Sequence, residues 1–264
     1  MTSIIAVYSM KGGVGKTTTA VNLAHAAAAA GNRTLLWDID AQGAATFLLS
    51  GDSANGKARR LFSRDVEPST LITPTHWPRL DLLAADLSLR NLDQTLADAD
   101  KPKRLRKLLQ GLEAGYDRIV LDCPPGLGEI SDQLFRAVDL IVVPLLPTPL
   151  SLRSLELIED HIERHHKGGP QLLPVLSMVD RRKTMHRDCL AAHAGWPVIP
   201  QASVVERMAA RQAPLAEFAA TSPAAHAFAE LWQQVEASLA PDKPGAPQES
   251  APTLARIPKA GRRK

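Results

Sequence analysis

A glycine-rich segment near the amino terminus constrains the fold of this 264-residue chain more than any other feature. The segment reads Lys11-Gly-Gly-Val-Gly-Lys16-Thr-Thr; an apolar run, Ile4–Tyr8, precedes it, and an alanine-rich stretch with high helix propensity follows it. Glycines allow backbone N–H groups to converge on an anion without a Cβ in the way, and the amino terminus of a following helix adds a positive partial charge. The order strand, glycine-rich loop, helix therefore predicts a phosphate-binding loop, which contains Gly12, Gly13, Val14, Gly15, Lys16, Thr17 and Thr18.

Two side chains of this loop carry its expected chemistry. Lys16 would neutralise the β- and γ-phosphates of a nucleotide, and the Thr17 hydroxyl would bind Mg²⁺. A strict search for the motif G-x-x-x-x-G-K-[ST] misses the segment, because Met10 stands at the position of the leading glycine. A lysine, Lys11, follows one position later.

Two further strands are expected to end in carboxylates. The apolar segment Tyr116–Asp122 ends at Asp122, and a Pro-Pro-Gly turn follows shortly after it. Asp122 would act on Mg²⁺ through a bound water; the alternative is a carboxylate that only caps a turn. Asp38 and Asp40 end an earlier strand, and because side chains alternate along a strand, only one of these two can face the γ-phosphate squarely.

Apolar runs that favour strands alternate with helical patterns along the chain. Several runs are apolar at consecutive positions, as expected for strands covered on both faces. A last helix is expected after Ser222 as N-cap and Pro223 in the first turn. The alternation predicts a single α/β domain over residues 1–240, a mostly parallel twisted sheet with helices on both faces. Together with the phosphate-binding loop, this architecture predicts a P-loop NTPase fold. The expected strands are Ile4–Tyr8, Thr34–Asp38, Leu80–Ala84, Arg118–Asp122, Leu140–Val143 and Leu172–Ser177.

Composition excludes several classes of protein. Hydrophobic residues make up 45% and charged residues 22%, as in globular proteins, and no apolar run is long enough to span a bilayer. Two distant cysteines and the absence of a signal-peptide pattern predict a cytoplasmic protein. Residues 241–264 contain five prolines and six basic residues against two acidic ones, so we expect a flexible, basic tail. The rest of the chain is close to neutral, and the basic pI near 8.9 is weak support for a nucleic-acid surface on it.

Three motifs together resemble those of the ParA/MinD family of partitioning and positioning ATPases. The segments Lys11–Thr18, Asp38-Ile-Asp40-Ala-Gln-Gly43 and Leu121-Asp-Cys-Pro-Pro-Gly126 are similar to the family's deviant Walker A, Walker A′ and Walker B motifs. The resemblance covers roughly residues 4–240 and is closest to the short, Soj-like ParA proteins. Later segments also resemble the family, namely Ala137–Pro144, Val198–Pro200, Glu206 and Thr221–Pro223.

The resemblance implies a role for each matching residue. Lys11 matches a signature lysine that reaches the partner's phosphates in an ATP-bound dimer, as a lysine counterpart of an arginine finger. Asp40 matches the acid that orients the attacking water, and Asp38 is expected nearer the metal. ATP and Mg²⁺ are thus the implied cofactors, and a homodimer that forms with ATP and separates on hydrolysis is the implied switch. The implied catalytic residues are Lys11, Lys16 and Asp40; the implied metal-binding residues are Thr17, Asp38 and Asp122.

The chain also departs from the family pattern. The family usually has proline where Ala41 stands and asparagine where Ala44 stands, which bears on how the loop responds to partners. Members that coat DNA often have arginine after the proline at Pro200, where this chain has Gln201. A basic surface could still neutralise DNA phosphates without reading bases; the alternative is scattered solvated charges. The candidate DNA-binding residues are Arg181, Arg182, Lys183, Arg187, Arg207 and Arg211.

Other conspicuous residues are expected to be structural. His186, Cys189 and His193 share one helix face but lack a fourth ligand of matching spacing, so helix packing is favoured over a metal site. His161, His165 and His166 are expected at the polar end of a helix. A solvated helix face is expected opposite a stripe of leucines, with Lys101, Lys103, Arg104, Arg106 and Lys107.

Together these patterns predict a slow, partner-stimulated ATPase that partitions or positions DNA or a protein cargo. The expected partners are a second copy of the chain, nonspecific nucleoid DNA and a ParB-like or other activating adaptor, with no membrane and a nucleoid-associated, cytoplasmic location. One alternative is a membrane-surface ATPase of the MinD kind, for which the tail offers only Leu254 and Ile257 as apolar anchors. Another is an ATP-coupled metabolic enzyme, either an iron protein, which needs paired cysteines, or an amide-forming synthetase.

Overall fold

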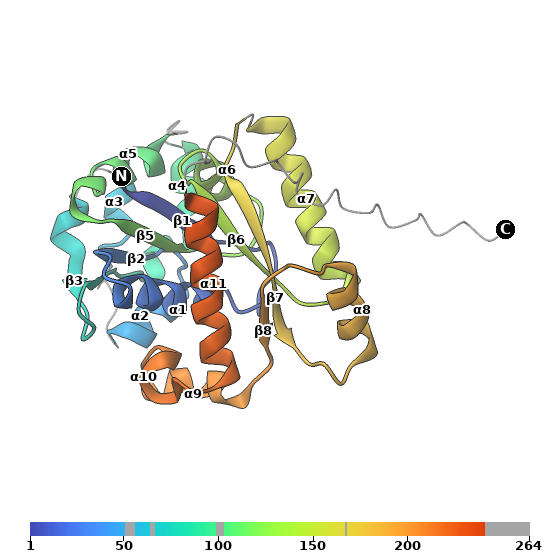
Figure 1. Ribbon diagram of the computed structural model, residues 1–264. Helices are drawn as coiled ribbons and strands as arrows, with labels where there is room; N and C mark the ends of the chain where they lie inside the picture. The colour runs from blue at the N-terminus through green and yellow to red at the C-terminus, as the bar shows by residue number, and fades with distance from the viewer. Residues whose placement is uncertain (51–55, 64–66, 99–102, 167, 241–264) are drawn as a thin grey trace.

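A single eight-stranded sheet forms the centre of the molecule, in a computed structural model that describes residues 1–50, 56–63, 67–98, 103–166 and 168–240 (Figure 1). The strand order is β3-β4-β2-β5-β1-β6-β7-β8, and every pair is parallel except β3 with β4. The strands are β1 (Ser3–Val7), β2 (Thr34–Asp38), β3 (Ile72–Pro74), β4 (Leu80–Leu83), β5 (Arg118–Asp122), β6 (Leu140–Leu145), β7 (Gln171–Val179) and β8 (Val198–Pro200).

Eleven α-helices and three short 3₁₀-helices connect these strands within the described residues. The α-helices are α1 (Lys16–Ala29), α2 (Ala44–Leu49), α3 (Arg60–Ser63), α4 (Leu92–Asp98), α5 (Arg104–Gln110), α6 (Glu129–Phe135), α7 (Pro149–His165), α8 (Thr184–Ala192), α9 (Ser203–Arg211), α10 (Leu215–Ala219) and α11 (Pro223–Leu239). The 3₁₀-helices are η1 (Pro68–Leu71), η2 (Leu87–Asn91) and η3 (Glu113–Gly115). None of the helices in this part of the chain has the length and apolar character needed to cross a bilayer.

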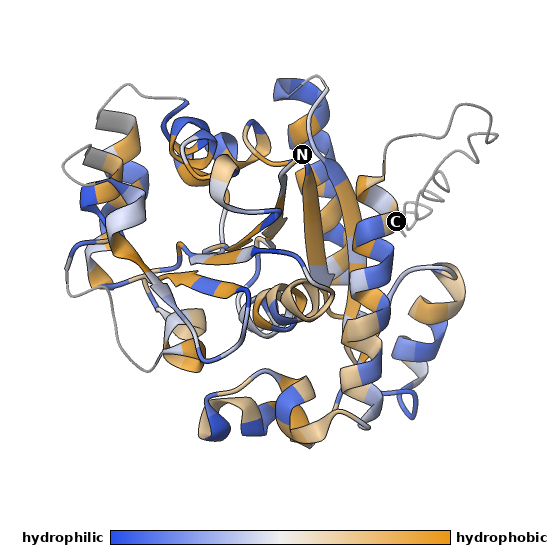
Figure 2. Ribbon diagram, turned by 60° about the vertical axis from the view of Figure 1, so that its left-hand side comes forward, coloured by the Kyte–Doolittle hydropathy of each residue, from blue (hydrophilic) through white to orange (hydrophobic). Residues whose placement is uncertain are grey.

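Two hydrophobic cores lie on opposite faces of the sheet. In β5, Ile119 and Leu121 point into the core beneath α3 to α7, whereas Val120 points into the core beneath α1, α2, α9, α10 and α11. The central strands are hydrophobic along most of their length, while the surrounding helices alternate between hydrophobic and hydrophilic residues (Figure 2). Burial on both faces explains why the central strands lack a polar alternation. The predicted α/β fold with helices on both faces is confirmed.

The predicted elements agree closely with the structure in the centre of the sheet and less at its edges. β2 and β5 have the predicted bounds, and Ser222 is the N-cap of α11, as predicted; its Oγ accepts a hydrogen bond from the backbone N–H of Ala225 at 3.2 Å. The edge strand β3 was not predicted, because its three residues carry no periodic pattern. The expected tail, 241–264, and Lys101 lie outside the described residues, so the domain boundary at residue 240 stays a prediction.

One expectation about α5 is wrong. Arg104 was assigned to a solvated helix face, but it is only 7% exposed, and its guanidinium donates hydrogen bonds to the carbonyls of Leu61 and Phe62 in α3. The sequence pattern groups Arg104 with other basic residues, and this pattern does not reveal that α3 packs against Arg104. Arg104 therefore ties α5 to the two middle residues of the four-residue helix α3 instead of facing water.

Loss of packing beneath α11 should destabilise the protein strongly. Leu231 is fully buried in the core that joins α11 to the sheet, so Leu231→Ala leaves a cavity and should lower the free energy of unfolding by about 2–5 kcal/mol. Urea denaturation without nucleotide measures this change. The control is Leu87→Ala, at a residue that is 60% exposed, which should change stability by less than about 0.5 kcal/mol. Equal effects of the two substitutions would contradict this account of the core.

Candidate nucleotide site

The glycine-rich loop runs from the end of β1 to the start of α1 and depends on glycine at two positions with positive φ. Gly13 has φ 71° and Gly15 has φ 90°, a left-handed conformation that side chains with a Cβ rarely adopt. A Cβ on Gly15 would also lie 3.1 Å from the Ser177 Oγ in β7. Gly15 is the N-cap of α1, whose first turn has no side-chain cap and no acidic residue. The amino terminus of this 14-residue helix is therefore available to an anion.

Lys16 and Lys11 lie at the two ends of this loop. Lys16 is 8% exposed, and its Nζ donates a hydrogen bond to the Lys11 backbone carbonyl at 3.0 Å. Burial lowers the pKa of Lys16, while the negative charges of Asp122 and Asp40 act in the opposite direction. The Lys16 ammonium therefore lies in the field of the two carboxylates that the sequence assigned to the same site.

Asp122 is a buried carboxylate whose oxygens accept no hydrogen bond within the described residues. It is fully buried at the end of β5, and neither of its oxygens has a partner among the described residues. Burial raises the pKa of Asp122 well above its usual range, and repulsion from Asp38 raises it further. A nearby Thr17 hydroxyl and Lys16 lower it. A carboxylate with unsatisfied oxygens beside a threonine hydroxyl is the donor set that Mg²⁺ prefers, so these residues fit that ion.

Asp38 has the opposite character, because its oxygens are already occupied. Its Oδ2 accepts hydrogen bonds from the Thr46 backbone N–H at 2.9 Å and from the Thr46 hydroxyl at 2.8 Å, and its Oδ1 accepts one from the Asp40 N–H at 3.1 Å. Burial raises the pKa of Asp38 to about 6 in spite of these bonds. The Thr46 hydroxyl accepts in turn from the Ala85 N–H at 2.9 Å. Asp38 thus fixes α2 against the ends of β2 and β4.

Thr46 was not singled out in the sequence, because a contact across eight residues depends on how α2 packs against the sheet.

Asp40 lies in the loop between β2 and α2 and is half-buried. Its Oδ1 accepts a hydrogen bond from the Gln42 N–H at 2.9 Å. The structure therefore brings Lys16, Asp38, Asp40 and Asp122 to one edge of the sheet, where the carboxyl ends of β1, β2 and β5 meet.

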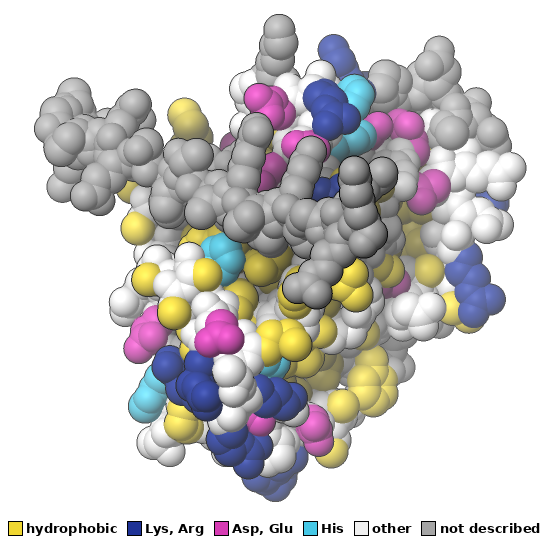
Figure 3. Space-filling view, turned by 90° about the vertical axis from the view of Figure 1, so that its right-hand side faces the viewer, with side chains coloured by type: hydrophobic (Ala, Val, Ile, Leu, Met, Phe, Trp, Pro, Cys, Tyr) yellow, Lys and Arg dark blue, Asp and Glu magenta, His cyan; other side chains and the backbone are white. Residues whose placement is uncertain are grey.

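The candidate DNA-binding residues lie in two groups away from this loop. Arg181, Arg182, Lys183 and Arg187 are exposed where β7 leads into α8, and Arg207 and Arg211 are exposed on α9. Basic side chains gather at the lower end of the face that carries α7 and α8 (Figure 3).

Several of these arginines have partners in the protein. The Arg182 guanidinium pairs with Asp180 through two bonds of 2.9 Å and holds the pKa of that carboxyl well below its usual range. Arg187 donates to the backbone carbonyls of Arg181 and Arg182, and Arg207 lies 5.8 Å from the centre of the Phe218 ring. Arg182 is therefore partly neutralised, whereas no carboxylate of the described residues lies within ion-pair distance of Arg181 or Lys183.

The residues of the α8 face pack as structural groups. The backbone N–H of Asp180 donates to His186 Nδ1 at 3.0 Å, Cys189 is buried against β7, and His193 stacks on Trp196 with ring centres 4.2 Å apart.

Cys123 is a buried free thiol beside Asp122, and burial raises its pKa well above the usual range. A low-pKa, reactive thiol is therefore not found at either cysteine.

A glycine-rich loop between β1 and α1, with buried carboxylates at the ends of β2 and β5, defines a P-loop nucleoside triphosphatase. The family model described as an AAA domain matches residues 2–173. The ParA chromosome partitioning protein of Myxococcus xanthus is 36% identical over 186 residues, which cover 68% of this chain and 66% of the relative. The chromosome-partitioning ATPase Soj of Thermus thermophilus is 34% identical over 246 residues, which cover 89% and 96%. The chain belongs to the ParA/MinD family of ATPases, and the predicted resemblance is confirmed.

Solved structures of similar proteins support the same fold. The cell division ATPase MinD of Pyrococcus furiosus matches 90% of this chain and 99% of its own, with a TM-score of 0.74 at 22% identity. The cobyrinic acid a,c-diamide synthase of Mycobacterium smegmatis, solved with bound ADP and magnesium, matches 89% and 94%, with a TM-score of 0.71 at 28% identity.

Removal of the Asp122 charge should stabilise the protein without nucleotide. The raised pKa means that Asp122 ionises more readily in the unfolded chain than in the folded protein, so the folded state loses stability as the pH rises above the usual pKa of an aspartate. Asp122→Asn should therefore raise the free energy of unfolding at pH 7 by about 1–3 kcal/mol. Urea denaturation should show this difference shrinking toward pH 4, where the Asp122 carboxyl of the unfolded chain also takes up a proton. A variant less stable than wild type at pH 7 would contradict this account.

Proposed function

We propose that this protein is an ATP-dependent dimerising switch that partitions or positions DNA or a protein cargo. The observation that carries the proposal is the charge at the nucleotide site. Asp122 has two buried oxygens without a donor, Lys16 lies in their field, and no carboxylate of the described residues lies within ion-pair distance of the Lys11 ammonium. A magnesium-bound triphosphate would supply a cation for the carboxylates and an anion for the lysines.

Each residue of the site has a place in this proposal. Mg²⁺ would be held by the Thr17 hydroxyl and by Asp122, and supplies charge neutralisation of the phosphates when bound. The α1 amino terminus and Lys16 would bind the phosphates, and Asp40 would orient the attacking water. Lys11 would extend to the phosphates of a second copy, so ATP would close the dimer, and hydrolysis would release it. Asp38 was expected among the metal-binding residues, but both of its oxygens already accept hydrogen bonds from Thr46 and Asp40, so it would act through Thr46 and α2 instead.

The surface around the loop supports the dimer. Exposed apolar side chains lie near the carboxyl edge of the sheet, where Leu127 follows β5, Leu150 begins α7 and Met178 belongs to the end of β7. They are 40%, 73% and 37% exposed, and the Met178 Cε lies near Gly15, 3.6 Å from where a Cβ on it would stand. Exposed apolar groups concentrated around one site are typical of a protein contact.

We propose that the ATP-bound dimer binds nucleoid DNA nonspecifically through the basic residues around α8 and α9 and that a ParB-like or other adaptor stimulates slow hydrolysis. These steps would make the protein cytoplasmic and nucleoid-associated. The named relatives from Myxococcus and Thermus, both chromosome partitioning proteins, support a role in partitioning.

A second candidate function is ATP-dependent amide formation, which the match to the Mycobacterium synthase supports. In that case ATP turnover would require a carboxylic acid and an amine donor as substrates, and DNA would not change its rate. ATP turnover stimulated by DNA and an adaptor without such substrates would exclude it. Liposome binding with ATP would instead favour a MinD-like membrane function.

The dimer can be tested in a variant that holds ATP. Asp40→Ala should slow hydrolysis at least tenfold and, with saturating ATP and Mg²⁺, double the mass measured by analytical ultracentrifugation. Adding Lys11→Ala should restore the monomer, because the cation that would cross the interface is gone. Adding Lys57→Ala instead, at an exposed lysine, serves as the matched control. An Asp40→Ala protein that stays monomeric with ATP and Mg²⁺ would overturn the proposed switch.

DNA binding depends on a separate surface and has a separate test. In the ATP-bound Asp40→Ala protein, Arg181→Ala with Lys183→Ala should weaken binding to random-sequence DNA about tenfold and lower the slope of log K against log salt by about 2. Fluorescence anisotropy at several salt concentrations measures both. Lys103→Ala with Lys107→Ala, on α5, removes the same charge from another surface and should have little effect. If the two pairs behave alike, the α8 surface does not bind DNA.

A further inference from the structure

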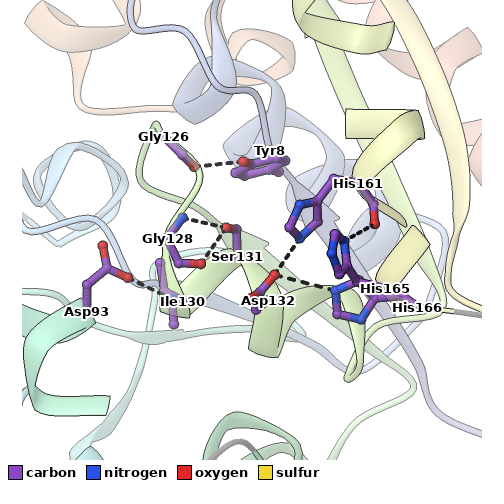
Figure 4. A network of polar contacts seen from close by, with 10 residues as sticks. All are labelled: Tyr8, Asp93, Gly126, Gly128, Ile130, Ser131, Asp132, His161, His165 and His166. Atoms are coloured by element: carbon purple, nitrogen blue, oxygen red, sulfur yellow. Dashed lines mark hydrogen bonds and ion pairs between the residues drawn. The ribbon is translucent and has the colours of Figure 1, made fainter. Parts of the chain in front are cut away.

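Outside the nucleotide site, three side chains from two helices converge on one point. Asp132 lies in α6, His161 lies in the last turns of α7, and His166 is the C-cap of that helix. One ligand atom of each residue lies within 4.8 Å of the other two. His161 Nε2 lies 2.6 Å and His166 Nε2 lies 3.4 Å from the same carboxylate oxygen, Asp132 Oδ1 (Figure 4). Among the described residues this is the one group of His, Cys, Asp and Glu side chains that meets this geometry.

The second observation is an unsatisfied imidazole. The His166 side chain is 2% exposed, and its Nδ1 is buried without a hydrogen-bond partner in the described part of the chain. Its other nitrogen makes only the 3.4 Å contact, which is longer than a good N–H···O bond. A buried ring with so little hydrogen bonding is costly unless something else binds it. A cation shared with His161 and Asp132 would bind the His166 Nε2, the nitrogen that faces Asp132, and would replace this long contact with a strong bond; the unpartnered Nδ1 lies on the other side of the ring.

The site is also held in place and open to solvent. Phe135 packs against His161 and His166 with ring centres 5.8 and 5.6 Å apart, and His165 Nδ1 lies 3.0 Å from the His161 carbonyl oxygen. The side chains of Asp132 and His161 are 34% and 26% exposed, so an ion can enter and keep a water ligand. Two imidazoles, one carboxylate and a water match the tetrahedral donor set of zinc, whereas Mg²⁺ and Ca²⁺ prefer oxygen ligands alone.

We propose that Asp132, His161 and His166 form a binding site for a first-row transition-metal ion, Zn²⁺ foremost, which ties the end of α7 to α6. The site is independent of the proposed function and does not include the nucleotide.

The place of α6 suggests what the ion does. Ser131 caps this helix, because its Oγ accepts from the Gly128 N–H at 2.8 Å and donates to the Gly128 carbonyl at 2.7 Å. The Tyr8 hydroxyl, from the start of the glycine-rich loop, donates to the Gly126 carbonyl at 2.7 Å, and the Tyr8 ring meets Phe135 edge to face at 5.4 Å. An ion at Asp132 would therefore fix the helix that supports the loop after Asp122.

The test uses the full-length, untagged protein, freed of metal with a chelator and kept without nucleotide. Titration with Co²⁺, followed by its visible absorption, and competition with Zn²⁺ should show one ion bound per chain with micromolar or tighter affinity. Saturating Zn²⁺ should raise Tm by about 5–10 °C. His161→Gln and His166→Gln should each weaken binding at least tenfold. His165→Gln, which removes a neighbouring exposed histidine, and Asp122→Asn, which alters the nucleotide site, should keep it.

Two controls make every result decisive. Circular dichroism and unfolding without metal show whether each variant folds; because His161 is partly exposed, His161→Gln is the variant expected to fold best. If it does not fold, Asp132→Asn takes its place, and the stoichiometry of the wild-type protein still decides whether a site exists. Wild-type protein that binds no Zn²⁺ at micromolar concentration, or binding that survives in folded His161→Gln protein, would overturn the proposal and leave a hydrogen-bonded cluster only.

Discussion

Two carboxylates on adjacent strands, buried side by side, are the constraint on which the site depends. Asp38 and Asp122 are register partners of β2 and β5, and both are fully buried. The charge of Asp38 raises the free energy of charging Asp122, and burial raises this cost for both carboxyls. The two differ in their neighbours: Asp38 accepts three hydrogen bonds, whereas Asp122 accepts none within the described residues. A cation would therefore stabilise the charged form of Asp122, and among the described residues Lys16 is the cation whose charge lowers its pKa.

This arrangement links the charge at the nucleotide site to the position of α2. Asp38 holds Thr46 through two hydrogen bonds, and Thr46 holds the backbone of Ala85 after β4. A cation at Asp122 would offset the negative charge next to Asp38 and so favour the ionised form of Asp38. The ionised carboxylate is the stronger hydrogen-bond acceptor. The loop with Asp40 lies between these two carboxylates and α2, and therefore responds to both. Binding of a cation at Asp122 would thus couple to the position of this loop through one buried pair of carboxyls.

The sequence predicted the centre of the molecule better than its connections. β2 and β5 were predicted with the right bounds, because strands buried on both faces are continuously apolar, and the glycine-rich loop was recognisable from its order of residue types. The roles of Thr46, Arg104 and Asp132 were not visible, because each depends on another element. Arg104 bonds to carbonyls 42 and 43 positions away, and Asp132 meets His161 across 29. A sequence pattern reports the period of one element, not what packs against it.

The helix α6 connects the nucleotide site to the group formed by Asp132, His161 and His166. Its amino end is fixed by Ser131 and follows the loop after Asp122, while Asp132, one residue further, faces the two histidines of α7. Because α6 has only seven residues, a displacement of one end of the helix also displaces the other end. Phe135 strengthens this coupling, because it packs against Tyr8 on one side and both histidines on the other. A change in how His161 and His166 hold Asp132 would therefore reach the nucleotide loop through rigid contacts, without a change in the sheet.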